Sequence, residues 1–282
     1  DAALVLINRA DGSFGMAELF SDTIDLVAMY WADMDADGGA DALFLSADGT
    51  PGLYQNLRAN AFVPASGFPE LQNVAALATG DMSGNGYFEV IILYESGQLS
   101  LLEFIPRHQR WDERPLELDA NMPDGFQPGE TILFVMDADN NGSPDIIYSN
   151  QEHGRMLLGD GNGGFSVLEI NQPGRISSIY DVNGNERLDL IGSTAALEAF
   201  ELRNIGERNC NAYSIRARAS GTDGDRRINS FGIGGEMEIR AGLQYQKQLI
   251  TSPIVHFGLG EYEEAEMLRI IWPNGSVQAE FA

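Results

Sequence analysis

Cysteine and lysine are almost absent from this sequence, and both absences narrow the chemistry open to it. Cys210 is the only cysteine, so no disulfide can form within the chain. Lys247 is the only lysine, which leaves little scope for Schiff-base or phosphate-binding lysine chemistry. The protein therefore works either in a reducing compartment or in one where something other than disulfides cross-links its loops.

Long apolar runs and a signal segment are also missing. No apolar run approaches the ~20 residues of a membrane-spanning helix, so no membrane insertion is expected. The sequence starts with neither Met nor a charged-then-apolar signal segment. We expect it to begin after a processing site or inside a longer parent chain.

Positive charge is scarce as well. Lys and Arg number 17 against 42 Asp and Glu, which gives a net charge of −25. Nearly all of this excess lies in residues 1–202. Such a field opposes binding to nucleic acid or anionic lipid. A solvated acidic surface or halophilic adaptation would also give this charge balance. The carboxylates are clustered at fixed spacing and not scattered, however, which favours a specific role for them.

The clustered carboxylates belong to a nine-residue segment that occurs four times, at 33–41, 81–89, 137–145 and 181–189. Each copy has an oxygen-bearing side chain at positions 1, 3, 5 and 9, and three copies have glycine at position 6. Short, nearly continuous apolar runs precede and follow each copy, and they predict strands packed on both faces. Asp1 and the apolar residues after it look like the ninth position of a fifth copy.

The spacing of these segments predicts the architecture. Their ninth positions, counted from Asp1, lie 40, 48, 56 and 44 residues apart. One blade of a β-propeller takes roughly 40–50 residues in four strands. The sequence thus predicts an all-β fold in which residues 1–202 form about four blades of a partial propeller, with upstream blades missing. Residues 203–282 are expected to form a separate β-rich domain.

The oxygens of the acidic segments are spaced for calcium. Side chains at positions 1, 3, 5 and 9, with the backbone carbonyl of position 7, supply the six to eight oxygens at ~2.4 Å that Ca²⁺ takes. Glycine at position 6 allows the positive φ that turns the chain around an ion. We predict up to four sites, with these ligands: Asp33, Asp35, Asp37, Gly39 and Asp41; Asp81, Ser83, Asn85, Tyr87 and Glu89; Asp137, Asp139, Asn141, Ser143 and Asp145; Asp181, Asn183, Asn185, Arg187 and Asp189.

Two alternatives compete with calcium sites. An EF-hand also begins with D-x-D-x-D-G, but it requires Glu at position 12 and flanking helices, and this sequence offers neither. The segments can also be Asx-turns of β-hairpins that need no metal. The first and third segments have the most carboxylates at the ligand positions and are the favoured sites, whereas Glu186 replaces the glycine of the fourth.

These motifs resemble two known families. Residues 1–202, with D-x-D-x-D-G-x-x-D loops and a GDGNGGF turn at 159–165, are similar to the FG-GAP/VCBS repeats of integrin-α-type propellers. Residues 203–282 resemble the ASPIC/UnbV domain, which follows such repeats in secreted proteins. They carry NAYSIR, GIGG, HFGLG and IWPNG in the order typical of that domain, although 244–255 lacks the family's usual glycines. The resemblance implies a small β-sandwich, which we expect to pack against the last blade.

Motifs of catalysis are few. His108 and His153 are predicted to lie in surface loops, and His256 to be a hydrogen-bonded structural residue. No G-x-S-x-G, H-E-x-x-H or C-x-x-C motif is present. The segment 103–128 is predicted to be irregular, and its carboxylates are the place to look if the protein catalyses a reaction.

The sequence therefore supports three hypotheses of function. The first is a non-enzymatic, calcium-binding propeller module that interacts with a protein or glycan at the cell surface or in the matrix, in an extracellular or periplasmic compartment. The second is a carbohydrate-active or other hydrolytic enzyme on the same scaffold. The third is a subunit of a larger surface assembly or filament.

Overall fold

The computed structural model confirms an all-β chain. It describes residues 2–9, 11–58, 61–118, 123–171, 174–206, 210–219 and 228–281. These residues form strands β1 to β23 and one short 3-10 helix, η1 (Pro106–His108), with no α-helix among them. No helix of the described part is long and apolar enough to cross a membrane. The prediction for Asp1 lies outside the described residues.

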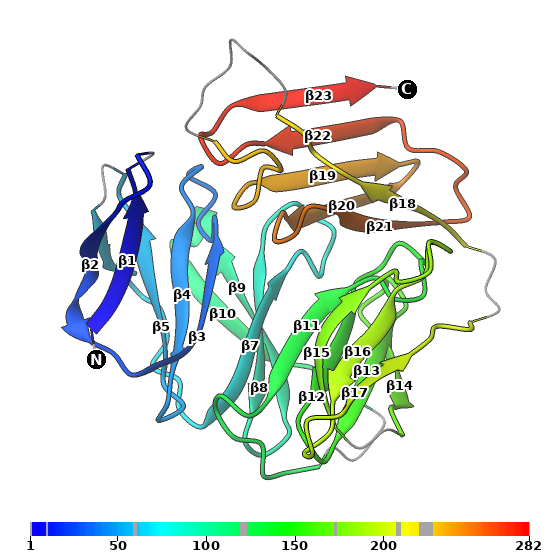
Figure 1. The fold of residues 1–282 in the computed structure, drawn as a ribbon, viewed down its shortest axis with the longest axis horizontal. Coiled ribbons are helices and arrows are strands. Elements are labelled where there is room, and N and C mark those ends of the chain that lie inside the picture. Colours follow the sequence, from blue (N-terminus) through cyan, green and yellow to red (C-terminus); the bar gives the residue numbers. More distant parts are fainter. Residues whose placement is uncertain are drawn as a thin grey trace.

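The first part of the chain forms five antiparallel sheets in chain order (Figure 1). A hairpin of two strands comes first, three sheets of four strands follow, and a sheet of three strands ends the series. The strands are β1 (Ala2–Asn8) and β2 (Phe14–Thr23); β3 (Leu26–Ala32), β4 (Asp41–Ser46), β5 (Pro51–Asn56) and β6 (Phe62–Pro64); β7 (Val74–Gly80), β8 (Glu89–Tyr94), β9 (Leu99–Ile105) and β10 (Arg110–Pro115); β11 (Ile132–Met136), β12 (Asp145–Ser149), β13 (Gly154–Gly159) and β14 (Phe165–Glu169); β15 (Arg175–Tyr180), β16 (Asp189–Ser193) and β17 (Ala199–Leu202).

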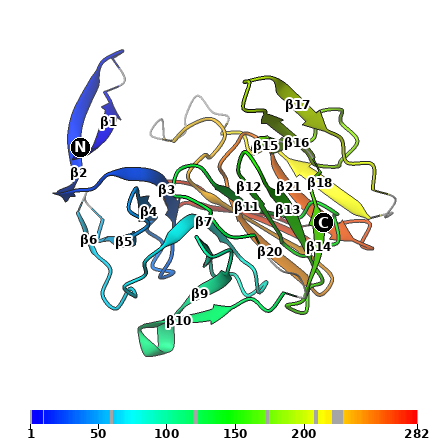
Figure 2. The ribbon, with the colours of Figure 1, turned by 90° about the horizontal axis from the view of Figure 1, so that it is seen from below.

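The four sheets from β3 to β17 are meanders whose first strands lie next to one another, while the hairpin contacts the first of them through β2 and β6. β7 contacts both β3 and β11, and β11 also contacts β15. The approach is close, because a Cβ at Gly80 of β7 would come within 2.6 Å of Val135 of β11. Figures 1 and 2 show the sheets following one another around these inner strands. This is the predicted propeller-like array, and the described sheets do not close into a ring.

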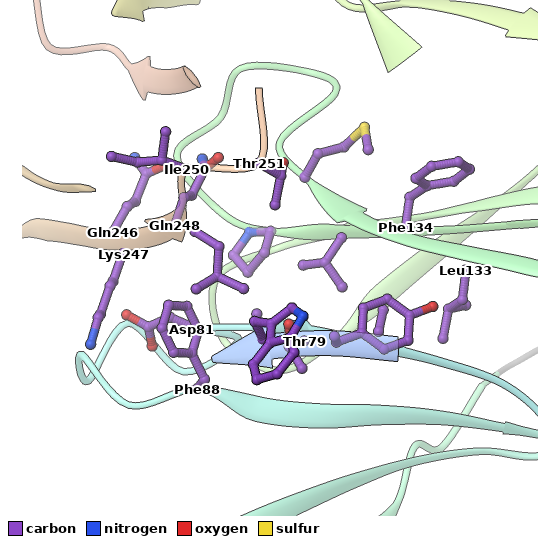
Figure 3. Close-up of a pocket in the computed structure, with 18 of the residues that line it drawn as sticks. Thr79, Asp81, Phe88, Leu133, Phe134, Gln246, Lys247, Gln248, Ile250 and Thr251 are labelled. Atoms are coloured by element: carbon purple, nitrogen blue, oxygen red, sulfur yellow. The ribbon is translucent and has the colours of Figure 1, made fainter. Parts of the chain in front are cut away.

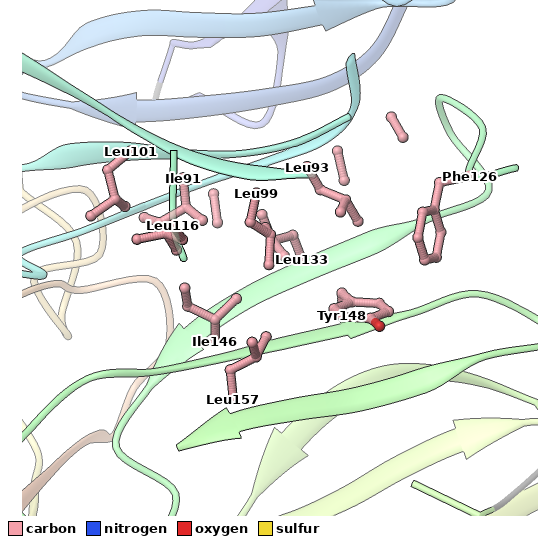
Figure 4. Close-up of a cluster of buried hydrophobic side chains, with 13 residues drawn as sticks. Ile91, Leu93, Leu99, Leu101, Leu116, Phe126, Leu133, Ile146, Tyr148 and Leu157 are labelled. Atoms are coloured by element: carbon pink, nitrogen blue, oxygen red, sulfur yellow. The ribbon is translucent and has the colours of Figure 1, made fainter. Parts of the chain in front are cut away.

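Apolar runs form the second strand of the sheets because both faces of that strand are covered. Five consecutive residues are buried in each of β4, β8 and β12, as the nearly continuous apolar runs predicted. One apolar cluster fills each junction between neighbouring sheets. Figure 4 shows the cluster in which Ile91 and Leu101 meet Leu133, Ile146 and Leu157 across such a junction.

The prediction that 103–128 is irregular is wrong for its first half. Residues 110–115 are strand β10, which pairs with β9 across the turn at η1. The remainder, outside residues 119–122, which are not described, contributes to the core: Phe126 is fully buried and its ring meets Tyr148 edge-on at 5.2 Å. The sequence did not reveal this hairpin because β10 is mostly charged and exposed, with only Trp111 packed against the core.

The C-terminal part forms two sheets that enclose their own core. Strands β18 (Asn211–Ile215) and β21 (Val255–Gly260) pair, and β20 (Gln244–Leu249), β19 (Glu236–Ala241), β22 (Met267–Ile271) and β23 (Val277–Phe281) form a second sheet in that order. Met237, Phe257 and Trp272 lie in the cluster between them. The predicted sandwich-like unit and the buried indole are both present.

The position of this unit goes beyond the prediction. We expected it against the last blade, and Tyr180 of the last sheet and Asp181, which follows it, do line a pocket together with Ser214 and His256. Strands β20 and β21 also lie across the ends of the second and third four-stranded sheets (Figure 1).

Glycines allow the two parts to approach this closely. A Cβ at Gly258 of β21 would overlap Asp137, and one at Gly84 would lie 3.2 Å from the carbonyl oxygen of Tyr245. The unit therefore covers the end of the array that carries the acidic segments.

Candidate metal centres

Each acidic segment is the loop between the first and second strands of a sheet. The first loop joins β3 to β4, the second β7 to β8, the third β11 to β12 and the fourth β15 to β16. Since the sheets repeat the same meander, all four loops emerge at the same end of the array, the end that faces the C-terminal sheets (Figure 1). Strands and not helices flank the loops, which excludes the EF-hand.

One hydrogen-bond scheme shapes all four loops. The carboxylate at position 1 accepts the backbone N–H groups of positions 5 and 6, as Asp33 does from Asp37 and Gly38 at 3.0 and 2.9 Å. Asp81, Asp137 and Asp181 repeat these bonds. The side-chain oxygen at position 5 accepts the N–H of position 7, and the carboxylate at position 9 accepts the N–H of position 2 in every loop.

Two positions of each loop adopt positive φ. Position 6 does so as predicted, at 84° in Gly38, 85° in Gly86 and Gly142, and 63° in Glu186. Position 4 does so as well, which the sequence reasoning missed. The residues there are Ala36, Gly84, Asn140 and Gly184, with φ between 61° and 75°. Glycine or asparagine at three of the four positions was the signal that could have shown it.

The strained residue of the fourth loop gives a test of this geometry. Glu186→Gly should stabilise the protein by up to about 1 kcal/mol, because glycine adopts positive φ without the steric cost of a Cβ. Urea unfolding would measure the gain. Glu186→Gln is the matched control, since it removes the same charge but keeps the strain. A gain of equal size in both variants would show that charge, and not backbone strain, is responsible.

The structure brings together three carboxylates in each of two loops. Oxygens of Asp33, Asp35 and Asp37 all lie within 4.8 Å of one another, and so do oxygens of Asp137, Asp139 and Asp145. Ligands on opposite sides of one Ca²⁺ ion are about 4.8 Å apart, twice a Ca–O distance of ~2.4 Å. Both clusters therefore fit a single calcium ion. They lie in the first and third loops, the two that the sequence favoured.

The remaining predicted ligands are placed less uniformly. Asp41 lies outside the first cluster, and its two oxygens accept N–H bonds from Met34 and Asn56 at 3.0 and 2.9 Å. Asn141 belongs to the third loop, where its Oδ1 accepts the N–H of Ser143 at 2.7 Å. The second and fourth loops have only two carboxylates each at the predicted ligand positions. Metal ligation in these two loops stays a prediction.

Burial makes the metal-free carboxylates costly. Desolvation raises the pKa of Asp41 to about 7 and that of Asp145 to about 7, and neighbouring carboxylates add to the rise. The pKa of Asp137 is raised well above its usual value for the same reasons, burial first and the charge of Asp145 second. A bound divalent cation would supply the missing counter-charge and hold these groups in their ionised form.

The third loop is also the main hydrogen-bonded contact with the C-terminal unit. Asn140 receives a bond from His256 Nε2 at 2.6 Å through its side chain and one from the Gly260 N–H at 2.8 Å through its carbonyl. Gln244 Nε2 donates to the carbonyl of Asn141 at 2.9 Å. Asn140 Nδ2 in turn donates to the carbonyl of Glu186, which ties the third loop to the fourth. His256 is thus the hydrogen-bonded structural residue that was predicted, while His108 and His153 are exposed on turns.

Burial of His256 predicts a dependence on pH. Desolvation lowers its pKa to about 4, so the folded state keeps it neutral while the unfolded state binds a proton below pH 6.5. His256 therefore contributes a loss of about 1–2 kcal/mol of stability between pH 7 and pH 5. Buried carboxylates such as Asp41 and Asp145, whose pKa is raised to about 7, contribute a gain over the same range, so the effect of His256 is measured as a difference between two proteins. In denaturant unfolding without calcium, His256→Gln, which keeps a donor but cannot titrate, should change by about 1–2 kcal/mol more favourably from pH 7 to pH 5 than the unsubstituted protein. An identical change in both proteins would contradict the assignment.

The comparison with protein families gives a match near the C-terminal end of the chain. Residues 225–280 match the family model described as ASPIC and UnbV, so the resemblance is confirmed for that segment. The FG-GAP/VCBS resemblance of residues 1–202 stays a prediction. No curated protein matches the chain.

Several solved structures are similar to this chain at low sequence identity. An Agrocybe aegerita lectin, described for specific recognition of non-reducing terminal N-acetylglucosamine, is 16% identical over 75% of this chain and 65% of its own, with a TM-score of 0.46. A Photorhabdus luminescens Tc holotoxin pore is 21% identical over 61% of this chain and 9% of its own, with a TM-score of 0.40. The V. cholerae biofilm matrix protein Bap1 is 10% identical over 90% of this chain and 48% of its own, with a TM-score of 0.33. The chain thus spans less than two thirds of the length of each of these proteins.

Proposed function

We propose that this protein is a calcium-stabilised, propeller-like binding module without catalytic activity. The observation that carries the proposal is the pair of three-carboxylate clusters, at Asp33, Asp35 and Asp37 and at Asp137, Asp139 and Asp145. They recur at the same place in the repeat, in a chain that cannot form an internal disulfide. Calcium bound there would supply positive charge and close each loop around a rigid centre.

The calcium sites would also serve the contact between the two parts of the chain. The third loop holds one carboxylate cluster and receives hydrogen bonds from His256, Gln244 and Gly260 of the C-terminal unit. An ion that fixes this loop would fix the acceptors on which the unit docks. Modules with calcium sites of this kind in extracellular settings bind as weakly as ~10⁻⁴–10⁻³ M, which supports an extracellular or periplasmic location.

A cavity between the two parts supports a binding role. About 420 Å³ of space lies where the inner strands β3, β7 and β11 meet β20 (Figure 3). Its lining combines the aromatic side chains of Tyr30, Trp31 and Phe134 with the amides of Gln246 and Gln248. Apolar walls with a few polar groups are typical of ligand sites. A protein segment or a glycan is the partner that we propose for the module.

The alternative of a hydrolytic enzyme has less support. The carboxylates of β10 are engaged in contacts of their own, because Asp112 pairs with Arg110 at 2.7 Å and Glu113 accepts a hydrogen bond from Tyr94 at 2.7 Å. A role as a subunit of a surface assembly is compatible with the binding module and differs from it only in the partner.

Calorimetric titration of metal-stripped protein with CaCl₂ tests the proposal. We expect saturable binding, with one ion fewer in Asp35→Asn and one fewer in Asp139→Asn. Asp124→Asn is the control, since this residue is exposed and lies outside the loops. Absence of binding up to ~10 mM calcium, well above the weakest affinities of extracellular modules, would refute the proposal.

A further inference from the structure

The second loop differs from the first and third in how its oxygens are used. As in the other loops, both oxygens of Asp81 accept backbone N–H groups, from Asn85 and Gly86 at 3.0 Å, and Glu89 accepts the N–H of Met82 at 2.7 Å. The difference is that Glu89 also accepts the hydroxyl of Ser83 at 2.7 Å. Positions 3 and 9 of this loop are therefore bonded to each other. The longer side chain of glutamate at position 9 makes this contact possible.

The C-terminal unit covers this loop directly. A Cβ at Gly84 would lie 3.2 Å from the carbonyl oxygen of Tyr245, and a Cβ at Gly86 would lie 3.1 Å from the hydroxyl of Tyr245. Both glycines have positive φ. Strand β20 therefore rests on the turn of the loop itself, at positions 4 and 6. Asp81 and Glu89 are buried beneath, at 6% and 2% exposure.

Lys247, the only lysine of the chain, lies in this contact. Its side chain extends from β20 towards the loop that carries Asp81 and Phe88 (Figure 3). The ammonium lies 4.6 Å from the centre of the Phe88 ring and 2.7 Å from Glu236 Oε2, in a residue that is 8% exposed. Burial raises the pKa of Asp81 to about 6, and the positive charge of Lys247 opposes part of that rise. A lysine this buried needs a carboxylate partner. Its ion pair is with Glu236 of the C-terminal unit, and its positive charge also acts on Asp81 of the second loop and Asp33 of the first.

We propose that Lys247 takes the place of a metal ion at the second loop, so that this loop docks the C-terminal unit and does not bind calcium. The ammonium supplies positive charge beside this loop and opposes a divalent ion there. Its charge also acts on Asp33 of the first loop, but that loop gathers three carboxylates within 4.8 Å of one another, whereas the second loop has only Asp81 and Glu89. The first and third loops, with three clustered carboxylates each, remain the calcium loops. The assignment of calcium to the first and third loops rests on the proposed function. The docking of the C-terminal unit at the second loop does not, because it requires no calcium.

Calcium stoichiometry gives the first test. In calorimetric titration with CaCl₂, Glu89→Gln should bind as many ions as the unsubstituted protein, whereas the matched change Asp145→Asn at position 9 of the third loop should weaken or remove one site. Loss of one ion in Glu89→Gln would overturn the proposal. If the unsubstituted protein binds no calcium at all, the proposed function fails, and the assignment of Lys247 is still tested as follows.

A double-mutant cycle in EGTA gives the second test. Lys247→Met keeps most of the length of the side chain but removes the charge, and Asp81→Asn removes the carboxylate of the second loop on which that charge acts. We expect the two changes to be coupled by about tenfold in the unfolding equilibrium constant, within the range found for contacting charges. Lys247→Arg should retain most of the stability that Lys247→Met loses. Additive effects of the two changes would overturn the proposal.

Discussion

Calcium should raise the midpoint of thermal unfolding of the metal-stripped protein by roughly 5–10 °C at ten times the dissociation constant. Each site then contributes about 1.4 kcal/mol, and two sites about 3 kcal/mol, which for a chain of this size corresponds to a shift of that order. The physical reason is the burial of carboxylates such as Asp137 and Asp145, which lack a counter-charge until an ion binds. Magnesium should give a smaller shift, because it demands a tighter octahedral shell.

Substitution within a cluster separates specific sites from a general salt effect. Asp139→Asn should lose about half of the calcium-dependent shift, since it removes one ligand oxygen charge from the third loop. Asp124→Asn, outside the loops, should retain the whole shift. Equal responses of both variants to calcium, or a shift of the same size with sodium at matched ionic strength, would contradict specific binding in the loops.

Gly258→Ala should loosen the contact between the C-terminal unit and the third loop. The added Cβ would overlap Asp137 and lie 2.5 and 2.7 Å from the backbone Cα and carbonyl carbon of Asn140. Backbone atoms of a hydrogen-bonded loop cannot move aside as a flexible side chain does. Overpacking of this kind costs about 1–3 kcal/mol, and here the cost falls on the docking contact.

Hydrogen exchange locates the effect of this substitution. In Gly258→Ala, amides of β20 and of the third loop should exchange faster, while those of β8 and β12 should keep their protection. Gly206→Ala is the matched control, because its Cβ would meet only side-chain atoms of Asn204 and Arg187, at 3.1 and 3.4 Å. Unchanged exchange in β20 would show that Gly258 does not determine how the two parts dock.

The sequence predicted the repeating features of the fold because each repeat signals them again. Four acidic segments between apolar runs indicated four strand-loop-strand units, and all four are present as β3–β4, β7–β8, β11–β12 and β15–β16. The two clusters of three carboxylates were likewise predictable, since they follow from aspartate at fixed spacing in a loop of fixed shape. Each of the four copies predicts the same strand-loop-strand unit independently, and the four predictions agree.

Features that occur only once were not predictable in the same way. The position of the C-terminal unit depends on contacts between residues far apart in the sequence, such as His256 with Asn140 and Lys247 with Phe88. In neither pair does the residue type or the sequence spacing indicate that the two residues are in contact. Strand β10 was missed because its residues are largely exposed and charged, so it lacks the apolar pattern that reveals the other strands.

An anomalous difference map from crystals grown with calcium, or with terbium in its place, would locate the ions directly. We expect one peak among Asp33, Asp35 and Asp37, one among Asp137, Asp139 and Asp145, and none between Ser83 and Glu89. A map without a peak in the first and third loops at saturating calcium would contradict the view that these carboxylate clusters are ion-binding centres.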